Sequence, residues 1–151
     1  MSAGAADLRL VEAEKNQDAA ALRSLLKQKA DVNAADVDGT TALIYAAHHD
    51  DLDAVTLLLA AGADANTANL NHVTALSEAC SLGDGAMIEA LVRAGADPNL
   101  TWGEGETPLM TASRTGTISG VKALVARGAK VNAEAGYRGA NPWIGPGATQ
   151  E

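Results

Sequence analysis

Large rings and cysteine are nearly absent from this sequence. It has no phenylalanine, and aromatic residues make up only 3% of its 151 residues. A core built without such rings must use alanine, leucine and valine, so we expect thin packed layers rather than one bulky centre. The single cysteine, Cys80, excludes an internal disulfide and a cysteine-based metal site. We interpret Cys80 as a small buried hydrophobic residue.

Basic residues and long apolar runs are also scarce. The chain has 11 lysines and arginines against 19 acidic residues, a net charge of −8. That sign repels phosphate backbones, so we expect no nucleic-acid partner. The apolar run over residues 57–61 is too short to span a bilayer, and no charged-then-apolar signal peptide begins at Met1. We therefore expect a soluble protein without a membrane partner and favour the cytoplasm; a secreted or periplasmic location stays open if a leader was removed.

Several residue types recur at a fixed step of 33 residues. The series are Asn33, Asn66, Asn99 and Asn132; Ala30, Ala63, Ala96 and Ala129; Leu10, Leu43, Leu76 and Leu109; Ala13, Ala46, Ala79 and Ala112; and Leu25, Leu58, Leu91 and Leu124. Copies that stay in register without an insertion indicate one structural unit that stacks on its neighbours.

Each copy has the pattern of two helices followed by an extended loop. Leu43, Ala46 and Ala47 form the i, i+3, i+4 stripe of a first helix. The predicted caps are Thr41, Thr74 and Thr107 at the start of the first helix, Asp18, Asp51, Asp84 and Thr117 at the start of the second, and the left-handed glycines Gly62, Gly95 and Gly128 at its end. Lys29 occupies the glycine position in the first copy, and we expect it to have a positive φ.

A polar turn lies between consecutive copies. Asp38-Gly39 and Glu104-Gly105 are typical turn pairs. Asn71-His72 replaces them in the third copy, where we expect Asn71 to accept the left-handed backbone angles.

This pattern resembles the ankyrin repeat. The resemblance is carried by Asp38-Gly39-Thr40-Thr41-Ala42-Leu43 with Ala46-Ala47, by Gly105-Glu106-Thr107-Pro108-Leu109 with Ala112, and by the closings Gly62-Ala63-Asp64-Ala65-Asn66 and Gly95-Ala96-Asp97-Pro98-Asn99. The usual histidine after the leucine is replaced by Ile44, Ser77 and Met110, which removes the family's Thr–His hydrogen bond but not its fold. The resemblance implies an all-α solenoid of four stacked helix-turn-helix repeats with hairpin loops, and a protein-binding module rather than an enzyme.

We divide the chain into a repeat domain and a tail. The domain covers residues 1–132, with repeats at about 6–33, 34–66, 67–99 and 100–132, and the Gly/Pro-rich tail covers residues 133–151. A polar outer end is predicted at Asp7, Arg9, Glu12, Lys15 and Asn16. Three interpretations of the tail, which contains Tyr137, Trp143 and Ile144, stay open. It is a disordered or truncated repeat, it folds over Val121 and Leu124 of the fourth copy, or it is a self-association patch.

The resemblance places binding in a concave groove formed by the hairpin tips and the first helices, and we expect another protein to bind there. The predicted partner-binding residues are Val37, Asp38, Thr40, Tyr45, His48, His49, Leu70, Asn71, Val73, Glu78, Ser81, Leu82, Trp102, Glu104, Glu106 and Arg114. Aromatic anchors such as Tyr45 and Trp102 are typical of binding hot spots, although Trp102 has the alternative of lying on its own hairpin.

Two other functions are weighed against partner binding. One is a small hydrolase activity in the groove, with Glu78 as an acid close to His49 of the preceding copy and Ser77 and Ser81 as hydroxyls. No Gly-x-Ser-x-Gly, phosphate-loop or zinc signature supports it. The run 48–51, His-His-Asp-Asp, resembles a metal site only in composition, because adjacent histidines point about 100° apart on a helix. We therefore predict no metal and no cofactor. The other function is that of a fragment of a longer ankyrin scaffold.

Overall fold

The fold consists of short helices joined by turns and hairpin loops. The computed structural model describes residues 7–134. In that range the helices are α1 (Arg9–Lys15), α2 (Ala19–Lys27), α3 (Ala42–His48), α4 (Leu52–Ala60), α5 (Ala75–Leu82), α6 (Gly85–Arg93), α7 (Pro108–Thr115) and α8 (Ile118–Ala126). The described residues form no regular strand, and their β pairing consists of the isolated bridges Ala35–Thr41 and Trp102–Glu106. None of these helices is long and apolar enough to cross a membrane.

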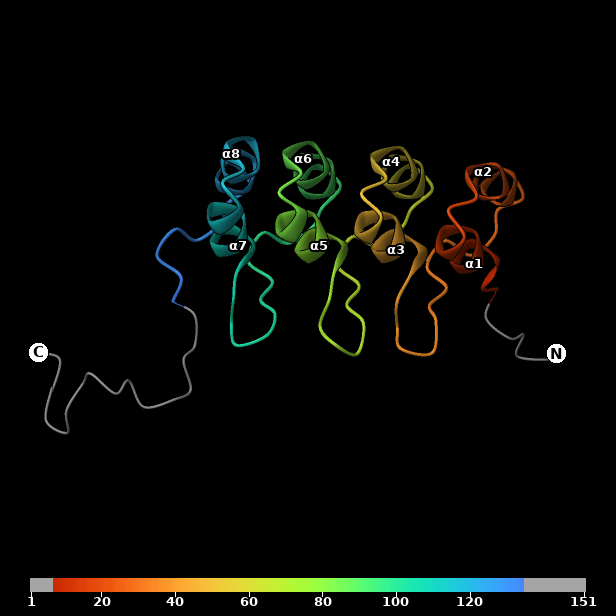
Figure 1. Ribbon diagram of the computed structural model, residues 1–151, viewed down its shortest axis with the longest axis horizontal. Coiled ribbons are helices and arrows are strands. Elements are labelled where there is room, and N and C mark those ends of the chain that lie inside the picture. The colour runs from red at the N-terminus through yellow and green to blue at the C-terminus, as the bar shows by residue number, and fades with distance from the viewer. Residues whose placement is uncertain (1–6, 135–151) are drawn as a thin grey trace, which may run out of the picture.

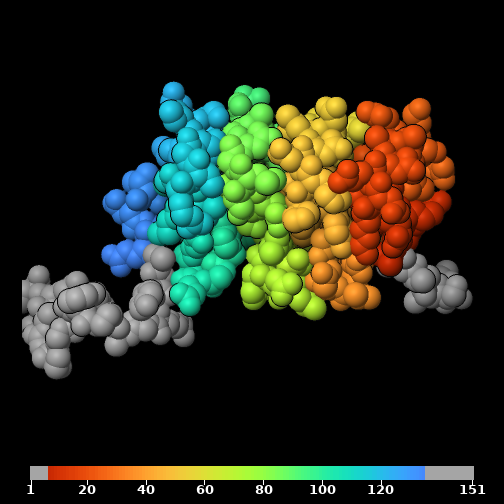
Figure 2. Space-filling model, in the orientation of Figure 1, coloured from red at the N-terminus to blue at the C-terminus, as the bar shows by residue number. Residues whose placement is uncertain are grey.

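The helices are stacked in two layers (Figure 1). Helices α1, α3, α5 and α7 form the first layer, and α2, α4, α6 and α8 form the second. The hairpin loops project from the first layer, away from the second (Figure 1). In the space-filling view, the successive pairs pack on one another as bands from red to blue (Figure 2). The predicted all-α solenoid of stacked helix pairs is confirmed, while the repeat bounds stay predictions.

Side chains at the predicted positions cap the helices. Thr41 accepts a hydrogen bond from the backbone N–H of Ile44 at 3.4 Å. Thr74 forms a full capping box, because its hydroxyl accepts from the N–H of Ser77 at 3.0 Å while the Ser77 hydroxyl accepts from the N–H of Thr74 at 2.9 Å. Asp18, Asp51, Asp84 and Thr117 cap the second helices, and Thr107 caps α7. Ser77 replaces the usual histidine, so this capping box stands where the Thr–His bond is expected.

Left-handed residues mark two turns of each helix pair. Lys29 has a φ of 56°, which confirms the prediction, and its register mate Gly62 has a φ of 93°. A second series was not predicted: Gln17, Asp50, Gly83 and Gly116 join the two helices of a pair, with φ between 52° and 76°. Both turns impose the same backbone on every copy, whether or not the residue there is glycine.

The second hairpin differs from the expectation. His72, not Asn71, takes the left-handed conformation, with a φ of 61°. The side chain of Asn69 explains the difference, because its oxygen accepts from the N–H groups of both Asn71 and Val73 at 3.0 Å. This turn places the left-handed residue at position 72, in register with Gly39 of the preceding hairpin.

Small residues form the centre of the stack. Ala46 and Ala47 on α3 and Cys80 on α5 are each 0% exposed. These side chains let α3 and α5, which pack directly on each other, approach closely. The burial of Cys80 confirms its interpretation as a small core residue. Burial also raises the pKa of its thiol to about 12, so the thiolate needed for nucleophilic chemistry does not form near neutral pH.

One asparagine links each helix pair to the next. The Asn33 side chain accepts from the N–H of Asp64 at 2.8 Å and donates to the carbonyl of Gly62 at 3.4 Å. Asn66 and Asn99 make the same two contacts one copy later. These bonds satisfy backbone groups just beyond the second helix of the following pair, where no helical partner exists. They account for Asn33, Asn66 and Asn99 in the series that recurs at 33-residue steps.

The two ends of the stack agree with the sequence only in part. Arg9 and Glu12 are exposed at the first end, as predicted. At the other end Ile118 is 71% exposed and Val125 is 45% exposed. Leu124 is 0% exposed in the core cluster and Val121 packs against it, while coverage of the fourth copy by the tail stays a prediction. The predictions for Tyr137, Trp143 and Ile144 lie outside the described residues.

Candidate functional site

The candidate site is the surface formed by residues 37–49, 70–82 and 102–114, which we call the hairpin surface. It comprises hairpin tips and the adjoining helices α3, α5 and α7 (Figure 1). The first and second hairpins are tied together, because the N–H of Leu70 donates to the carbonyl of Asp38 at 2.8 Å. The Asn69 side chain also donates to the Thr40 hydroxyl at 3.0 Å. These two hairpins therefore present their side chains on a fixed frame.

Tyr45 lies at the first junction of this surface. The Asp36 carboxylate accepts from the Tyr45 hydroxyl at 3.3 Å and pairs with the Lys15 ammonium, which lies 5.4 Å from the centre of the Tyr45 ring. The hydrogen bond between ammonium and carboxylate lowers the pKa of Asp36 and raises the pKa of Lys15. Tyr45 is half-buried rather than fully exposed, and Lys15 stands over its ring.

Glu78 bridges two helix pairs. One of its oxygens, Oε2, lies 3.2 Å from Nδ1 of His48 on the preceding first-layer helix. The sequence placed His49 beside Glu78, and this assignment is wrong. Consecutive residues on a helix point in different directions, and the His49 ring instead lies beside Tyr45, with 6.4 Å between ring centres. Nδ1 of His49 is buried and makes no hydrogen bond within residues 7–134.

Glu106 organises the last junction. Its Oε1 accepts from the Thr111 hydroxyl at 2.8 Å and from the Arg114 guanidinium at 2.5 Å. The Thr111 hydroxyl, followed by Arg114, lowers the pKa of Glu106. This carboxylate therefore stays ionised and holds Arg114 against the helix.

A cleft of about 230 Å³ opens between the second and third hairpins. Its lining residues are Asn71, His72, Val73, Ser77, Glu78, Ser81, Trp102 and Gly103. Asn71, Val73, Glu78, Ser81 and Trp102 are all predicted binding residues, so the fold brings together five residues from two of the three segments of the hairpin surface. Trp102 is half-buried and contacts the core, but it also lines this cleft.

The remaining predicted residues differ in their accessibility. Val37 is 95% exposed, Leu70 is 75% exposed and Leu82 is 49% exposed. Glu104 is also exposed, and Asp38 is half-buried. Thr40 is buried, and its hydroxyl accepts from Asn69. Thr40 therefore supports the hairpins from beneath the surface.

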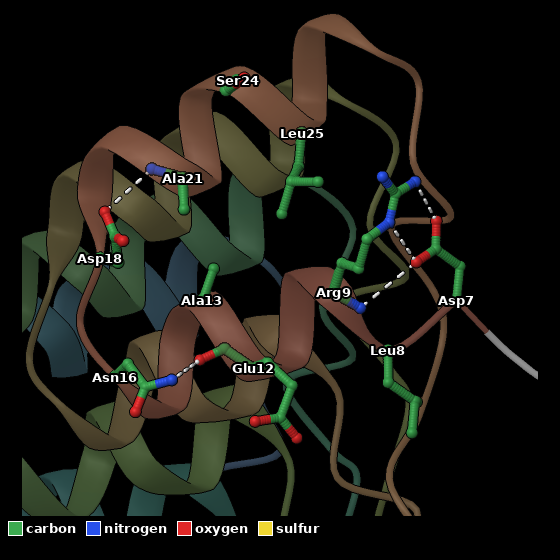
Figure 3. Close-up of a pocket in the computed structure, with 10 residues that line it drawn as sticks. All are labelled: Asp7, Leu8, Arg9, Glu12, Ala13, Asn16, Asp18, Ala21, Ser24 and Leu25. Carbon is green, nitrogen blue, oxygen red and sulfur yellow. Dashed lines mark hydrogen bonds and ion pairs between the residues drawn. The ribbon is translucent and has the colours of Figure 1, made fainter.

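Two further hollows lie mainly outside the hairpin surface. The larger, of about 790 Å³, lies against α1 and α2 at the first end of the stack, where Asp7 and Arg9 form an ion pair and Leu25 lies on the α2 side (Figure 3). The other, of about 420 Å³, is lined mainly by Gln17, His49 and the aspartates at 50, 51 and 53. Within the described chain, no three His, Cys, Asp or Glu side chains are grouped to hold a metal ion.

Sequence reasoning missed Lys15, although a signal was present. Its register mates His48, Ser81 and Arg114 were all predicted to bind. It also missed Glu14, a buried carboxyl that is 4% exposed. Burial, with a contribution from the charge of Asp51, raises the pKa of Glu14 to about 7. An alignment of the four copies would have shown Glu14 as unusual, because the equivalent positions have small residues: Ala47, Cys80 and Ser113.

Comparison with known families gives a match over the whole stack. A family model described as ankyrin repeats (3 copies) matches residues 10–102 and 68–135. Comparison with curated proteins gives no match. The two matched ranges contain the three segments of the hairpin surface.

Proposed function

The chain belongs to the ankyrin repeat family, and from that premise we propose that it binds a partner protein through its hairpin surface. Ankyrin repeats are generally protein–protein interaction modules, and the family is typically a non-enzymatic scaffold. Stacked repeats offer an extended surface whose side chains vary from copy to copy. Here that surface comprises the hairpins and the first-layer helices.

The exposure of apolar side chains on this surface carries the proposal. Val37, Leu70 and Leu82 are large apolar residues with exposed fractions of 95%, 75% and 49%. Covering a fully exposed side chain of this size contributes about 1.5 to 3 kcal/mol, and exposed apolar patches are typical of interaction sites. A partner that covers the first two hairpin tips and the end of α5 would gain part of this energy for each side chain.

Polar side chains on and beside the hairpin surface support the same function. Asp36 and Glu106 are each held by a cation and by a hydroxyl, and Glu78 is held by His48. Side chains already fixed lose less conformational entropy when a partner binds. The surface is therefore preorganised for recognition.

One of the two hydroxyls of the hydrolase alternative is already engaged within the fold. The Ser77 hydroxyl accepts from the N–H of Thr74 and donates to its carbonyl at 2.8 Å, so the capping box engages it fully. Cys80 is buried and its pKa is raised to about 12. A nucleophile needs a neighbouring base within hydrogen-bond reach, and neither group has one among its described partners. We propose that the surface is a binding site without catalysis.

Crosslinking mass spectrometry with the purified chain as bait, combined with variants, tests this proposal. Leu70→Ser with Leu82→Ser removes exposed apolar area, and Tyr45→Ala with Trp102→Ala removes the two aromatic residues. We expect the captured partner to crosslink within residues 37–114 and to be lost with both double variants. Binding should also weaken with added salt, because acidic groups contribute by screened attraction.

Ile118→Ser with Val131→Ser is the matched control. These residues are 71% and 67% exposed, like Leu70, but they lie outside the hairpin surface. The control variant should keep the partner. A partner that is lost with the control and retained by the Leu70 and Leu82 variant would contradict the proposal.

A further inference from the structure

The cleft between the second and third hairpins combines an acid with an aromatic wall. Glu78 comes from α5, and Trp102 comes from the following hairpin. Val73 adds apolar lining, and the cleft of about 230 Å³ matches one long side chain rather than a folded segment. Its size and composition therefore suit a single projecting group.

The carboxylate of Glu78 is available to such a group. Its side chain is 23% exposed, and Oε2 is the atom that contacts His48. No side chain of residues 7–134 donates to its other oxygen, Oε1. A carboxylate accepts several hydrogen bonds, so an incoming donor finds a free acceptor in the cleft.

The charges around the cleft favour a cation. Residues 34–99 contain ten acidic residues, one arginine and no lysine. That arginine, Arg93, pairs with Glu89 on α6 at 2.6 Å. Lys15 and Arg114 on either side of the hairpin surface are paired with Asp36 and Glu106. The net field of this region attracts positive charge.

We infer that this cleft recognises an arginine side chain of a basic partner segment. The guanidinium would donate to Glu78, its flat face would lie against the Trp102 indole, and its aliphatic stem would contact Val73. A planar guanidinium matches a carboxylate fork and stacks on an aromatic ring, whereas an ammonium does neither as well. The inference rests on the proposed function, because it specifies the chemistry of the partner at the same surface.

Acetyl-arginine amide is the probe, and Trp102 is the reporter. The chain has two tryptophans, so Trp143→Phe leaves Trp102 as the single indole. We expect saturable fluorescence quenching by acetyl-arginine amide, a weaker response to acetyl-lysine amide, and none to acetyl-citrulline amide, which has nearly the same shape without the charge. Equal responses to arginine and citrulline would overturn the inference.

Glu78→Gln tests the carboxylate, with Glu89→Gln as the matched control. Both substitutions remove one charge from a partly exposed glutamate, but Glu89 lies on α6 outside the cleft. We expect Glu78→Gln to weaken arginine binding about tenfold and Glu89→Gln to change it less than twofold. Helix content by circular dichroism verifies that both variants fold. An affinity that Glu78→Gln leaves unchanged contradicts the inference.

The two proposals fail separately. If the Leu70 and Leu82 variant loses the partner while acetyl-arginine amide leaves Trp102 unchanged, partner binding stands and the arginine cleft is wrong. If acetyl-arginine amide binds and Glu78→Gln weakens that binding as expected, while the hairpin variants keep the partner, the cleft stands and the proposed function is wrong.

Discussion

The two ends of the stack differ in the side chains that they expose where a further helix pair would otherwise pack. At the first end Arg9 occupies the register position where Ala42 and Ala75 are buried, and its guanidinium pairs with Asp7 at 2.7 Å (Figure 3). At the last end Ile118 and Val125 are apolar and exposed. A charged pair at a position that must otherwise be buried opposes the docking of another helix pair, because the charges would lose their water. The exposed apolar side chains at the last end do not oppose such docking.

This contrast shows that equivalent positions in a repeat do not have equivalent roles. Glu14 and Ser113 share one register position, yet Glu14 is 4% exposed against the following pair and Ser113 is exposed. Lys29 and Gly128 share another, with φ values of 56° and 90°. Substitutions at such pairs distinguish residues that every copy needs for folding from residues whose role depends on their place at one end of the stack.

The largest effect is expected at Glu14. Its pKa of about 7 in the folded protein lies above the ordinary value of 4.5, so the folded protein keeps a proton that the unfolded chain releases. The stabilisation is complete below about pH 4.5 and is lost as the pH rises to about 7. Relative to wild type, the unfolding free energy of Glu14→Ser should therefore increase by about 3 kcal/mol between these limits, measured by urea denaturation across pH.

Ser113→Glu is the control at the opposite end. The new carboxyl would be exposed, so its contribution should change by less than about 0.5 kcal/mol over the same pH range. A wild-type pH profile that matches that of Glu14→Ser would show that water reaches Glu14 and that its burial has no electrostatic cost.

An intermediate effect is expected at the apolar end. We expect the protein to self-associate through Ile118 and Val125, because exposed apolar patches favour contact between copies. Static light scattering should show a mass that rises above 15.3 kDa with concentration, whereas Ile118→Lys with Val125→Lys should remain monomeric. Ala19→Lys with Gln28→Lys adds the same charge at exposed positions of the first end and should still associate. A wild-type mass constant at 15.3 kDa would contradict this prediction.

The smallest effect is expected at the left-handed turn after the second helix. Lys29→Gly relieves backbone strain of roughly 1 kcal/mol but makes the unfolded chain more flexible, so stability should rise by only a few tenths of a kcal/mol. Gly128→Lys should cost about 1 kcal/mol, although its new Cβ would meet no atom within 4 Å. Thermal denaturation measures both, and a loss of stability in Lys29→Gly would show that lysine is not strained there.

The sequence was sufficient for features that are local or periodic. Thr41 caps α3 through a residue three positions away, and the cap does not depend on the rest of the fold. The recurring asparagines predict stacking because they keep one register over the whole array. The position of Lys29 follows from the same register, and its positive φ agrees.

Contacts between copies could not be predicted in the same way. The pairing of Glu78 with His48 rather than with His49 depends on the direction in which two adjacent side chains leave one helix turn. The ion pair of Lys15 with Asp36 depends on how far one pair is displaced against the next. Both are properties of the assembled stack, and a period in the sequence specifies neither.

The asparagine links have a consequence for synthesis on the ribosome. Asn33 precedes in the chain the loop that it holds, since its partners are the carbonyl of Gly62 and the N–H of Asp64. A growing chain emerges with its amino end first, so each amide is already in place when the loop that needs it appears. The same bonds would form in the reverse order if a chain refolded from its carboxyl end. Translation therefore proceeds in the same direction as these links, in which the asparagine after one helix pair binds the loop after the next pair.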